Sequence, residues 1–271
     1  MTDALDRIAA ALERMAPPPP PPPADARAHP AYLWRDGRLG AARAWAPTPL
    51  DLLVGIEPQK GTVLEQMRRL AAGLPAHDVL LWGARGSGKS ALVKAAVASV
   101  QADGGALALV EVGPDGLASL PDLFSLIADT PRGWALFLDD LGFAEGDGAP
   151  RLLRSLLEGG AEARPANVRL FVTANRRHVL PRQLSEEQGA LAPRDAADDA
   201  LALADRFGLS LGFHRCDQDT FLAMVSGYAA RHDLAFAREE ALAWATGRGG
   251  PSGRVAWQYV VELAGRAGRR L

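Results

Sequence analysis

Short apolar runs alternate with amphipathic stretches along the middle of the chain. The apolar runs are rich in Val, Leu and Phe, which favours strands that are buried on both faces. They cover residues 79–83, 106–112, 134–140, 168–175 and 208–213. The intervening stretches place apolar residues at helical spacing, most clearly over 88–100, 119–129 and 150–159. This alternation predicts an α/β fold with a five-stranded parallel sheet flanked by helices.

The two ends of the chain depart from this pattern. After residue 217 it becomes all-helical, at 218–232, 238–248 and 252–267, which predicts a small helical domain over 217–271 behind a core over 51–216. Apolar positions at helical spacing over 3–15 are followed by consecutive prolines at 17–23, which favour an extended, stiff spacer. We therefore expect a helix and linker over 1–23, and an irregular extension over 24–50.

Composition narrows the class of protein. The net charge is −2 and the pI about 6.2, so no general positive field indicates a nucleic-acid binder. A single cysteine, Cys216, suits a reducing compartment. The N-terminus lacks the pattern of a signal peptide, and no apolar run is long enough to span a membrane. We expect a cytoplasmic protein without a membrane segment.

Residues 83–90 read GARGSGKS and fit the spacing G-x-x-x-x-G-K-[ST], between a predicted strand and a predicted helix. Glycines let the backbone wrap phosphates closely, and the helix start presents its positive dipole end to the anion. Lys89 is expected to reach the β- and γ-phosphates, and Ser90 to ligate Mg²⁺. The predicted nucleotide contacts are Gly83, Ala84, Arg85, Gly86, Ser87, Gly88, Lys89, Ser90 and Ala91. Arg85 could instead be solvated or touch a neighbouring subunit.

A second motif ends the strand at 134–140. Asp139 lies at its tip and is expected to hold Mg²⁺ through the water shell of the ion. The strand at 106–112 falls between this strand and the one at 79–83 in the chain. An additional strand between the two motif strands is typical of one class of P-loop ATPases and is not expected in simple kinases.

With these motifs the sequence resembles the AAA+ branch of the P-loop ATPases. The segments GLPAHDVLLWGARGSGKSALVKA, FLDDLGF, LLEGGAEARPANVRLFVTANRRH and LADRFGLSLGF are together similar to an uncharacterised bacterial AAA+ family, a domain of unknown function, over about residues 28–268. The layout is more distantly similar to helicase loaders of the DnaC and IstB kind. The resemblance implies a P-loop core, a helical lid and ATP binding, and it names no substrate.

The resemblance also implies roles for single residues. Segment 51–60 resembles the stretch that cups the adenine, with contacts from Val54, Gly55 and Ile56. Asn175 resembles the polar sensor-1 residue, and Arg254 the sensor-2 arginine of the lid. Arg206 resembles the arginine finger, which in AAA+ rings reaches the nucleotide of the adjacent subunit. It therefore implies a homo-oligomer, expected to be a ring.

The sequence offers more than one candidate for the residue that polarises the attacking water. AAA+ enzymes usually carry a glutamate after the metal-binding aspartate, and this chain has Asp140, one methylene shorter. Asp140 could act with an adjusted loop, or Glu111 at the end of the strand at 106–112 could supply the carboxylate. Glu145 is a weaker candidate. Because small misplacements lower rates strongly, hydrolysis could also be slow. We favour Asp140, with Glu111 next.

These patterns predict an AAA+ ATPase that binds Mg-ATP and hydrolyses it at subunit interfaces, to drive or time the remodelling of an unknown protein partner. One alternative is an ATP-dependent binding switch that does not hydrolyse. Another is a nucleic-acid-associated ATPase of the helicase-loader kind, which the near-neutral charge disfavours. The acidic loop at 185–205 could dock a partner, although a solvated surface is the simpler interpretation.

Overall fold

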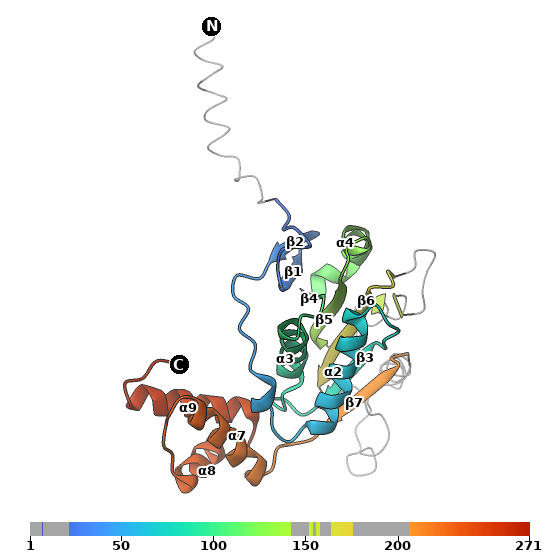
Figure 1. The fold of residues 1–271 in the computed structure, drawn as a ribbon. Coiled ribbons are helices and arrows are strands. Elements are labelled where there is room, and N and C mark those ends of the chain that lie inside the picture. The colour runs from blue at the N-terminus through green and yellow to red at the C-terminus, as the bar shows by residue number, and fades with distance from the viewer. Residues whose placement is uncertain (1–6, 8–21, 142–151, 154–155, 158–163, 176–205) are drawn as a thin grey trace.

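The computed structural model describes residues 7, 22–141, 152–153, 156–157, 164–175 and 206–271 (Figure 1). The strands are β1 (Ala31–Arg35), β2 (Arg38–Ala41), β3 (Val79–Gly83), β4 (Leu107–Val112), β5 (Gly133–Leu141), β6 (Val168–Asn175) and β7 (Leu209–Phe213). The helices are α2 (Glu57–Ala71), α3 (Lys89–Ala102), α4 (Leu120–Ile127), α7 (Gln218–Arg231), α8 (Arg238–Thr246) and α9 (Gly253–Arg266), with 3₁₀ turns η1 (Leu50–Leu52) and η2 (Pro114–Ser119).

The strands form one sheet of seven, in the order β2-β1-β4-β5-β6-β3-β7. All neighbours pair in parallel except β1 and β2. The five parallel strands predicted from the apolar runs are present as β3 to β7, so the α/β fold is confirmed. The strand β3 lies between β6 and the edge strand β7, so the end of β3 has a paired strand on each side.

The expectation of five strands, with irregular chain over 24–50, was wrong for residues 31–41. These residues form the hairpin β1–β2, which extends the sheet beyond β4. Tyr32 and Trp34 alternate along β1 and are fully buried. The turn between the strands is Asp36-Gly37, with φ of 51° and 68°. Positive φ at both central residues is the signature of a tight hairpin turn, and an Asp-Gly pair favours it.

The parallel strands carry apolar side chains on both faces. Alternate residues of β5 divide cleanly, since Trp134, Leu136 and Leu138 pack on one face and Ala135 and Phe137 on the other. The first face is covered by α4 and the second by α2 and α3 (Figure 1). Burial on both faces explains why the runs are almost continuously apolar.

The C-terminal helices α7, α8 and α9 pack around a separate apolar cluster. Phe221, Val225 and Tyr259 lie at its centre, and Leu52 of η1 contributes from the core side. Figure 1 shows these helices grouped together beyond the α3 side of the sheet. We refer to them as the lid. Within the part of the chain that the structure describes, no helix has the length and apolar character needed to cross a bilayer.

Several sequence predictions concern residues that the structure does not describe or describes only in part. The predicted N-terminal helix and most of the proline run, Glu145 and the loop at 185–205 lie outside the described residues. Of the predicted helix at 150–159, residues 152–153 and 156–157 are described, and they are helical.

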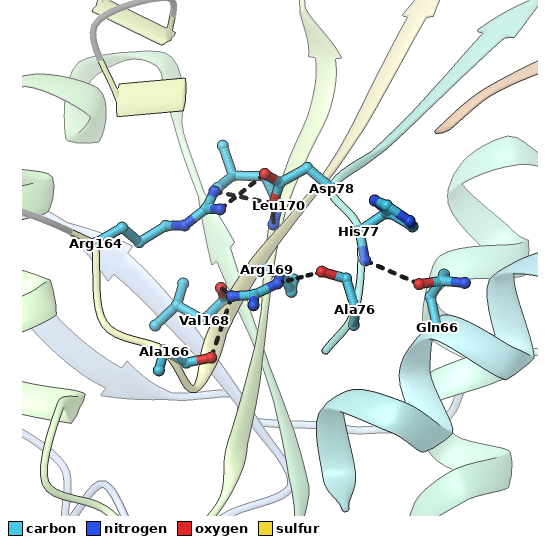
Figure 2. A network of polar contacts seen from close by, with 9 residues as sticks. All are labelled: Gln66, Ala76, His77, Asp78, Arg164, Ala166, Val168, Arg169 and Leu170. Carbon is cyan, nitrogen blue, oxygen red and sulfur yellow. Dashed lines mark hydrogen bonds and ion pairs between the residues drawn. The ribbon is translucent and has the colours of Figure 1, made fainter. Parts of the chain in front are cut away.

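A polar network joins β3 and β6 at their amino ends, at the sheet edge opposite the glycine loop (Figure 2). Both nitrogens of the Arg164 fork donate to the Asp78 carboxylate, at 2.9 and 2.8 Å, and the Leu170 N–H donates to the same carboxylate at 2.8 Å. Arg169 donates to the carbonyls of Ala76, Ala166 and Val168. The network fixes the segment that leads into β3.

Replacing Asp78 with alanine is therefore expected to lower the free energy of unfolding by about 3 kcal/mol, because Arg164 and the Leu170 N–H lose a shared, poorly exposed acceptor. Urea denaturation measures this change. The matched control is Asp103→Ala, which removes the carboxylate of an exposed pair with Arg68. Its expected effect is below about 0.5 kcal/mol. Equal effects of the two substitutions would contradict the interpretation.

Candidate nucleotide-binding site

The glycine loop connects the end of β3 to the start of α3. Gly83, Gly86 and Gly88 have φ of 132°, 71° and 92°, values that L side chains rarely adopt. At Gly83 a Cβ atom would lie 2.1 Å from the carbonyl oxygen of Phe213 in β7. The motif therefore needs glycine at Gly83 for contact with β7 as well as for the curvature of the loop.

Lys89 is the first residue of α3, and its side chain is buried against the loop. Its Nζ donates to the carbonyl oxygens of Gly83 and Ala84 at 3.0 and 2.8 Å. Burial lowers the pKa of Lys89, against the opposing effect of the Asp140 and Asp139 carboxylates, which raise it. The loop thus surrounds an ammonium group with partly lost hydration, the arrangement that favours an anionic ligand.

Asp139 joins α3 to the sheet. Its Oδ1 accepts a hydrogen bond of 2.5 Å from the Ser90 hydroxyl and one of 2.7 Å from the Thr173 hydroxyl. Hydroxyl and carboxylate oxygens are the ligands that Mg²⁺ prefers, so Ser90 and Asp139 fit such an ion. No group of three His, Cys, Asp or Glu residues suited to a metal exists among the residues described.

Asp140 and Asn175, two of the predicted site residues, are in contact. The Asn175 amide donates to the Asp140 carboxylate. The Asp140 N–H donates to the Thr173 hydroxyl at 2.8 Å, and Asp140 has a φ of 52°. Glu111, the rival carboxylate, instead forms an ion pair of 2.8 Å with Lys94 of α3. The two candidate carboxylates therefore have different partners, Asn175 for Asp140 and Lys94 for Glu111.

A cleft of about 590 Å³ separates the glycine loop from the lid. Residues 86–91 form one wall, and Arg254 and Trp257 of α9 contribute to the other. The Gly253 N–H donates to the Gly86 carbonyl at 3.0 Å, so the start of α9 contacts the loop directly. The predicted sensor-2 position therefore faces the same cleft as the glycine loop.

The remaining wall of the cleft is not formed by the residues that were predicted to contact adenine. It comes from residues 46–49 together with Leu52 and Leu53, in a segment that we call the strap (residues 42–53). Val54 packs against the lid and Ile56 is buried in the core. Gly55 lies against Thr220. Arg85 is exposed on the loop.

Arg206 lies far from the loop of its own chain. It precedes β7, whose first residue Leu209 pairs with Val79, the first residue of β3. The loop follows Gly83 at the other end of the same strand. The structure therefore brings Ser90, Asp139, Asp140, Asn175 and Arg254 to one edge of the sheet and leaves Arg206 at the opposite edge.

Two residues of the site were missed by sequence reasoning. Thr173 interrupts the apolar residues of β6 two positions before Asn175, a signal that could have identified it. Trp257 lines the cleft while its ring contacts Tyr228 and His232. Helical periodicity could not distinguish it from a residue of the lid core.

Comparison with known proteins places the chain in a group without an assigned activity. Residues 27–267 match the model of a family described as "Protein of unknown function (DUF815)". No curated protein matches the chain. Among solved structures, the Thermotoga maritima RuvB Holliday junction branch migration motor is similar with a TM-score of 0.52 and 19% identity, over 82% of this chain and 67% of that one.

A second similar structure is the Aeropyrum pernix Orc1 protein in complex with DNA. The TM-score is 0.53 and the identity 14%, over 83% of this chain and 66% of that one. At such low identities the similarity concerns the fold alone, which is AAA+-like. This chain spans about two thirds of the length of each of these two proteins.

Proposed function

The chain belongs to the DUF815 family, and from this premise we propose that it is an AAA+ ATPase that binds Mg-ATP between its core and its lid and hydrolyses it at subunit interfaces. One observation carries the proposal. At the ends of β5 and β6, Asp139 contacts Ser90 beside the glycine loop, while Asp140 contacts Asn175. A metal-binding pair and a polarising pair thus lie next to a loop that fits phosphates.

Each residue of this cluster has a part in the mechanism. The loop N–H groups, Lys89 and the positive end of the α3 dipole bind the β- and γ-phosphates. Ser90 and Asp139 hold Mg²⁺, which when bound neutralises charge on the phosphate oxygens. Asp140 orients the attacking water and accepts its proton, while Asn175 fixes the carboxylate.

The arginines connect the site to other parts of the assembly. Arg254 binds phosphate from the lid and so couples the position of the lid to the nucleotide state. Arg206 lies at the sheet edge opposite its own loop and serves the nucleotide of a neighbouring subunit. We therefore expect a homo-oligomer, a ring, whose ATP cycle remodels a protein partner.

The second candidate function is an ATP-dependent switch without turnover. One observation favours it, because Asp140 is shorter than the usual glutamate and its carboxylate is already held by Asn175. Tight ATP binding with negligible hydrolysis at every protein concentration would support the switch over the motor.

Steady-state turnover measured against protein concentration tests the proposed function. Turnover per chain is expected to rise with concentration, and Arg206→Ala to lower it by ~10³-fold or more, since a finger arginine stabilises charge in the transition state. The control is Arg238→Ala, an exposed arginine of the lid paired with Asp219. Its turnover is expected to match that of the unmodified protein.

A mixing experiment then tests whether Arg206 acts between chains. Subunits with Lys89→Met keep Arg206, and subunits with Arg206→Ala keep an intact loop. Mixed oligomers are expected to regain part of the turnover that each variant lacks alone. No recovery in mixtures, together with full activity at the lowest concentration, would contradict catalysis at an interface.

A further inference from the structure

The end of β5 carries one more residue than the facing part of β6. Leu138 pairs with Val172 and Leu141 pairs with Ala174, so two residues of β5, Asp139 and Asp140, lie opposite the single residue Thr173. This is a β-bulge, and the φ of 52° at Asp140 marks the extra residue. Bulges of this kind redirect the side chains next to them.

The bulge changes the face to which Asp140 belongs. In a regular strand successive side chains point to opposite faces, so Asp139 and Asp140 would separate. Leu138 and Leu141 both pack in the cluster on the α4 face, which shows that the alternation is interrupted between them. Asp140 is thereby brought to Asn175 rather than into the apolar layer under α4.

One buried hydroxyl connects the two aspartates across the bulge. The Thr173 side chain is 1% exposed. Its Oγ1 donates to Asp139 Oδ1 at 2.7 Å and accepts from the Asp140 N–H at 2.8 Å. Thr173 and Asn175 share a face of β6, because they are two residues apart in a strand. Two residues on one face of β6 thus contact the two consecutive aspartates of β5.

We propose that Thr173 is a positioning residue, whose hydroxyl locks the bulge and thereby sets the metal-binding carboxylate of Asp139 and the polarising carboxylate of Asp140 on one face. The inference rests on the proposed function. It accounts for an aspartate where AAA+ ATPases usually have glutamate, because the bulge and not a longer side chain determines where the second carboxylate lies.

The test compares Thr173→Val, which removes the hydroxyl at nearly constant volume, with Thr173→Ser, which restores it. A fluorescent ATP analogue is titrated into the full chain with and without Mg²⁺, and turnover is measured in parallel. Metal-free affinity is expected to be the same in all forms, since Lys89 and the loop carry it. Thr173→Val is expected to lose about 10- to 100-fold of the Mg²⁺-dependent gain in affinity and of turnover, and Thr173→Ser to recover most of both.

Thr130→Val is a matched control at the other end of the sheet. Its hydroxyl also makes two hydrogen bonds, donating to the Ile127 carbonyl at 2.6 Å and accepting from Trp134 Nε1 at 2.7 Å. It is expected to lower the melting temperature while the Mg²⁺-dependent gain stays at the level of the unmodified protein.

Other outcomes overturn the inference in distinguishable ways. An unchanged Mg²⁺ dependence in Thr173→Val would leave Thr173 a packing residue. Failure of Thr173→Ser to recover would assign the effect to the methyl group. An equal loss of metal-free affinity would indicate general damage to the cleft. Absence of nucleotide binding by the unmodified protein would reject the proposed function itself, and this inference with it.

Discussion

Replacing Lys89 with methionine is expected to weaken ATP binding by ~100-fold, the loss that accompanies removal of a charged hydrogen-bond donor. Turnover is expected to fall by ~10³-fold or more, because the same ammonium stabilises charge that develops on the phosphates. The reason lies in the placement of Nζ, which is enclosed by the loop and has the Gly83 and Ala84 carbonyls as its partners. Phosphate oxygens would offer this desolvated cation a better partner.

The same substitution should separate binding from stability. Burial lowers the pKa of Lys89, so folding disfavours its charged form. A lowered pKa means that stability rises as the pH increases from the folded-state value toward 10.5, and that the penalty is fully present below that folded-state value. Lys89→Met removes that penalty together with two hydrogen bonds, and its melting temperature is expected to be close to that of the unmodified protein.

Calorimetric titration with Mg-ATP and thermal unfolding measure the two quantities. Arg68→Met, at an exposed cation on α2, is the control and should change neither. Unchanged ATP affinity in Lys89→Met would falsify the assignment of the glycine loop as the phosphate site. A large drop in melting temperature would mean that Lys89 is chiefly structural.

Replacing Asp140 with asparagine is expected to lower turnover by ~10²- to 10³-fold while ATP binding is retained, since the variant loses a general base and little volume. The side-chain oxygen of the new asparagine can still accept the hydrogen bond from Asn175. The substitution therefore removes the negative charge at position 140 and keeps the position of the side chain. Asp140→Glu is expected to give no gain, because aspartate tolerates a φ of 52° better than glutamate, whose longer side chain cannot form the same local hydrogen bonds to the backbone.

Glu111→Gln is the informative comparison. Glu111 is held by Lys94 of α3, and the loss of that ion pair is expected to lower turnover less than Asp140→Asn does. Single-turnover hydrolysis, measured at saturating ATP, reports the chemical step for both variants. A larger loss in Glu111→Gln than in Asp140→Asn would transfer the role of polarising the water to Glu111.

Local motifs of this site were predictable, and long-range placement was not. The spacing of residues 83–90 between a strand and a helix identifies the loop, because its function depends on contiguous backbone. Asp139 and Asn175 end apolar runs, and the ends of parallel strands meet at one sheet edge. These positions therefore follow from strand direction alone.

The hairpin β1–β2 was missed although its Asp36-Gly37 turn is a strong local signal, because proline-rich surroundings dominated the interpretation of that segment. The strap could not be predicted as a wall of the cleft. Its position depends on how it crosses from the edge of the sheet toward the lid, which no periodicity encodes. The bulge at Asp140 is likewise a property of two strands together, and the sequence of β5 alone reads as a regular strand end.

The position of β3 between β6 and β7 has a consequence for how the chain is made. Its neighbours β6 and β7 begin at residues 168 and 209. Val79 therefore cannot pair with Phe171 and Leu209 until both residues have been synthesised. At typical synthesis rates this interval lasts on the order of ten seconds. The glycine loop therefore leaves the ribosome early and is assembled late, and β3 lacks both of its neighbouring strands in between. We therefore expect the yield of folded protein in a cell to depend on the state of that strand during synthesis as well as on the stability of the finished fold.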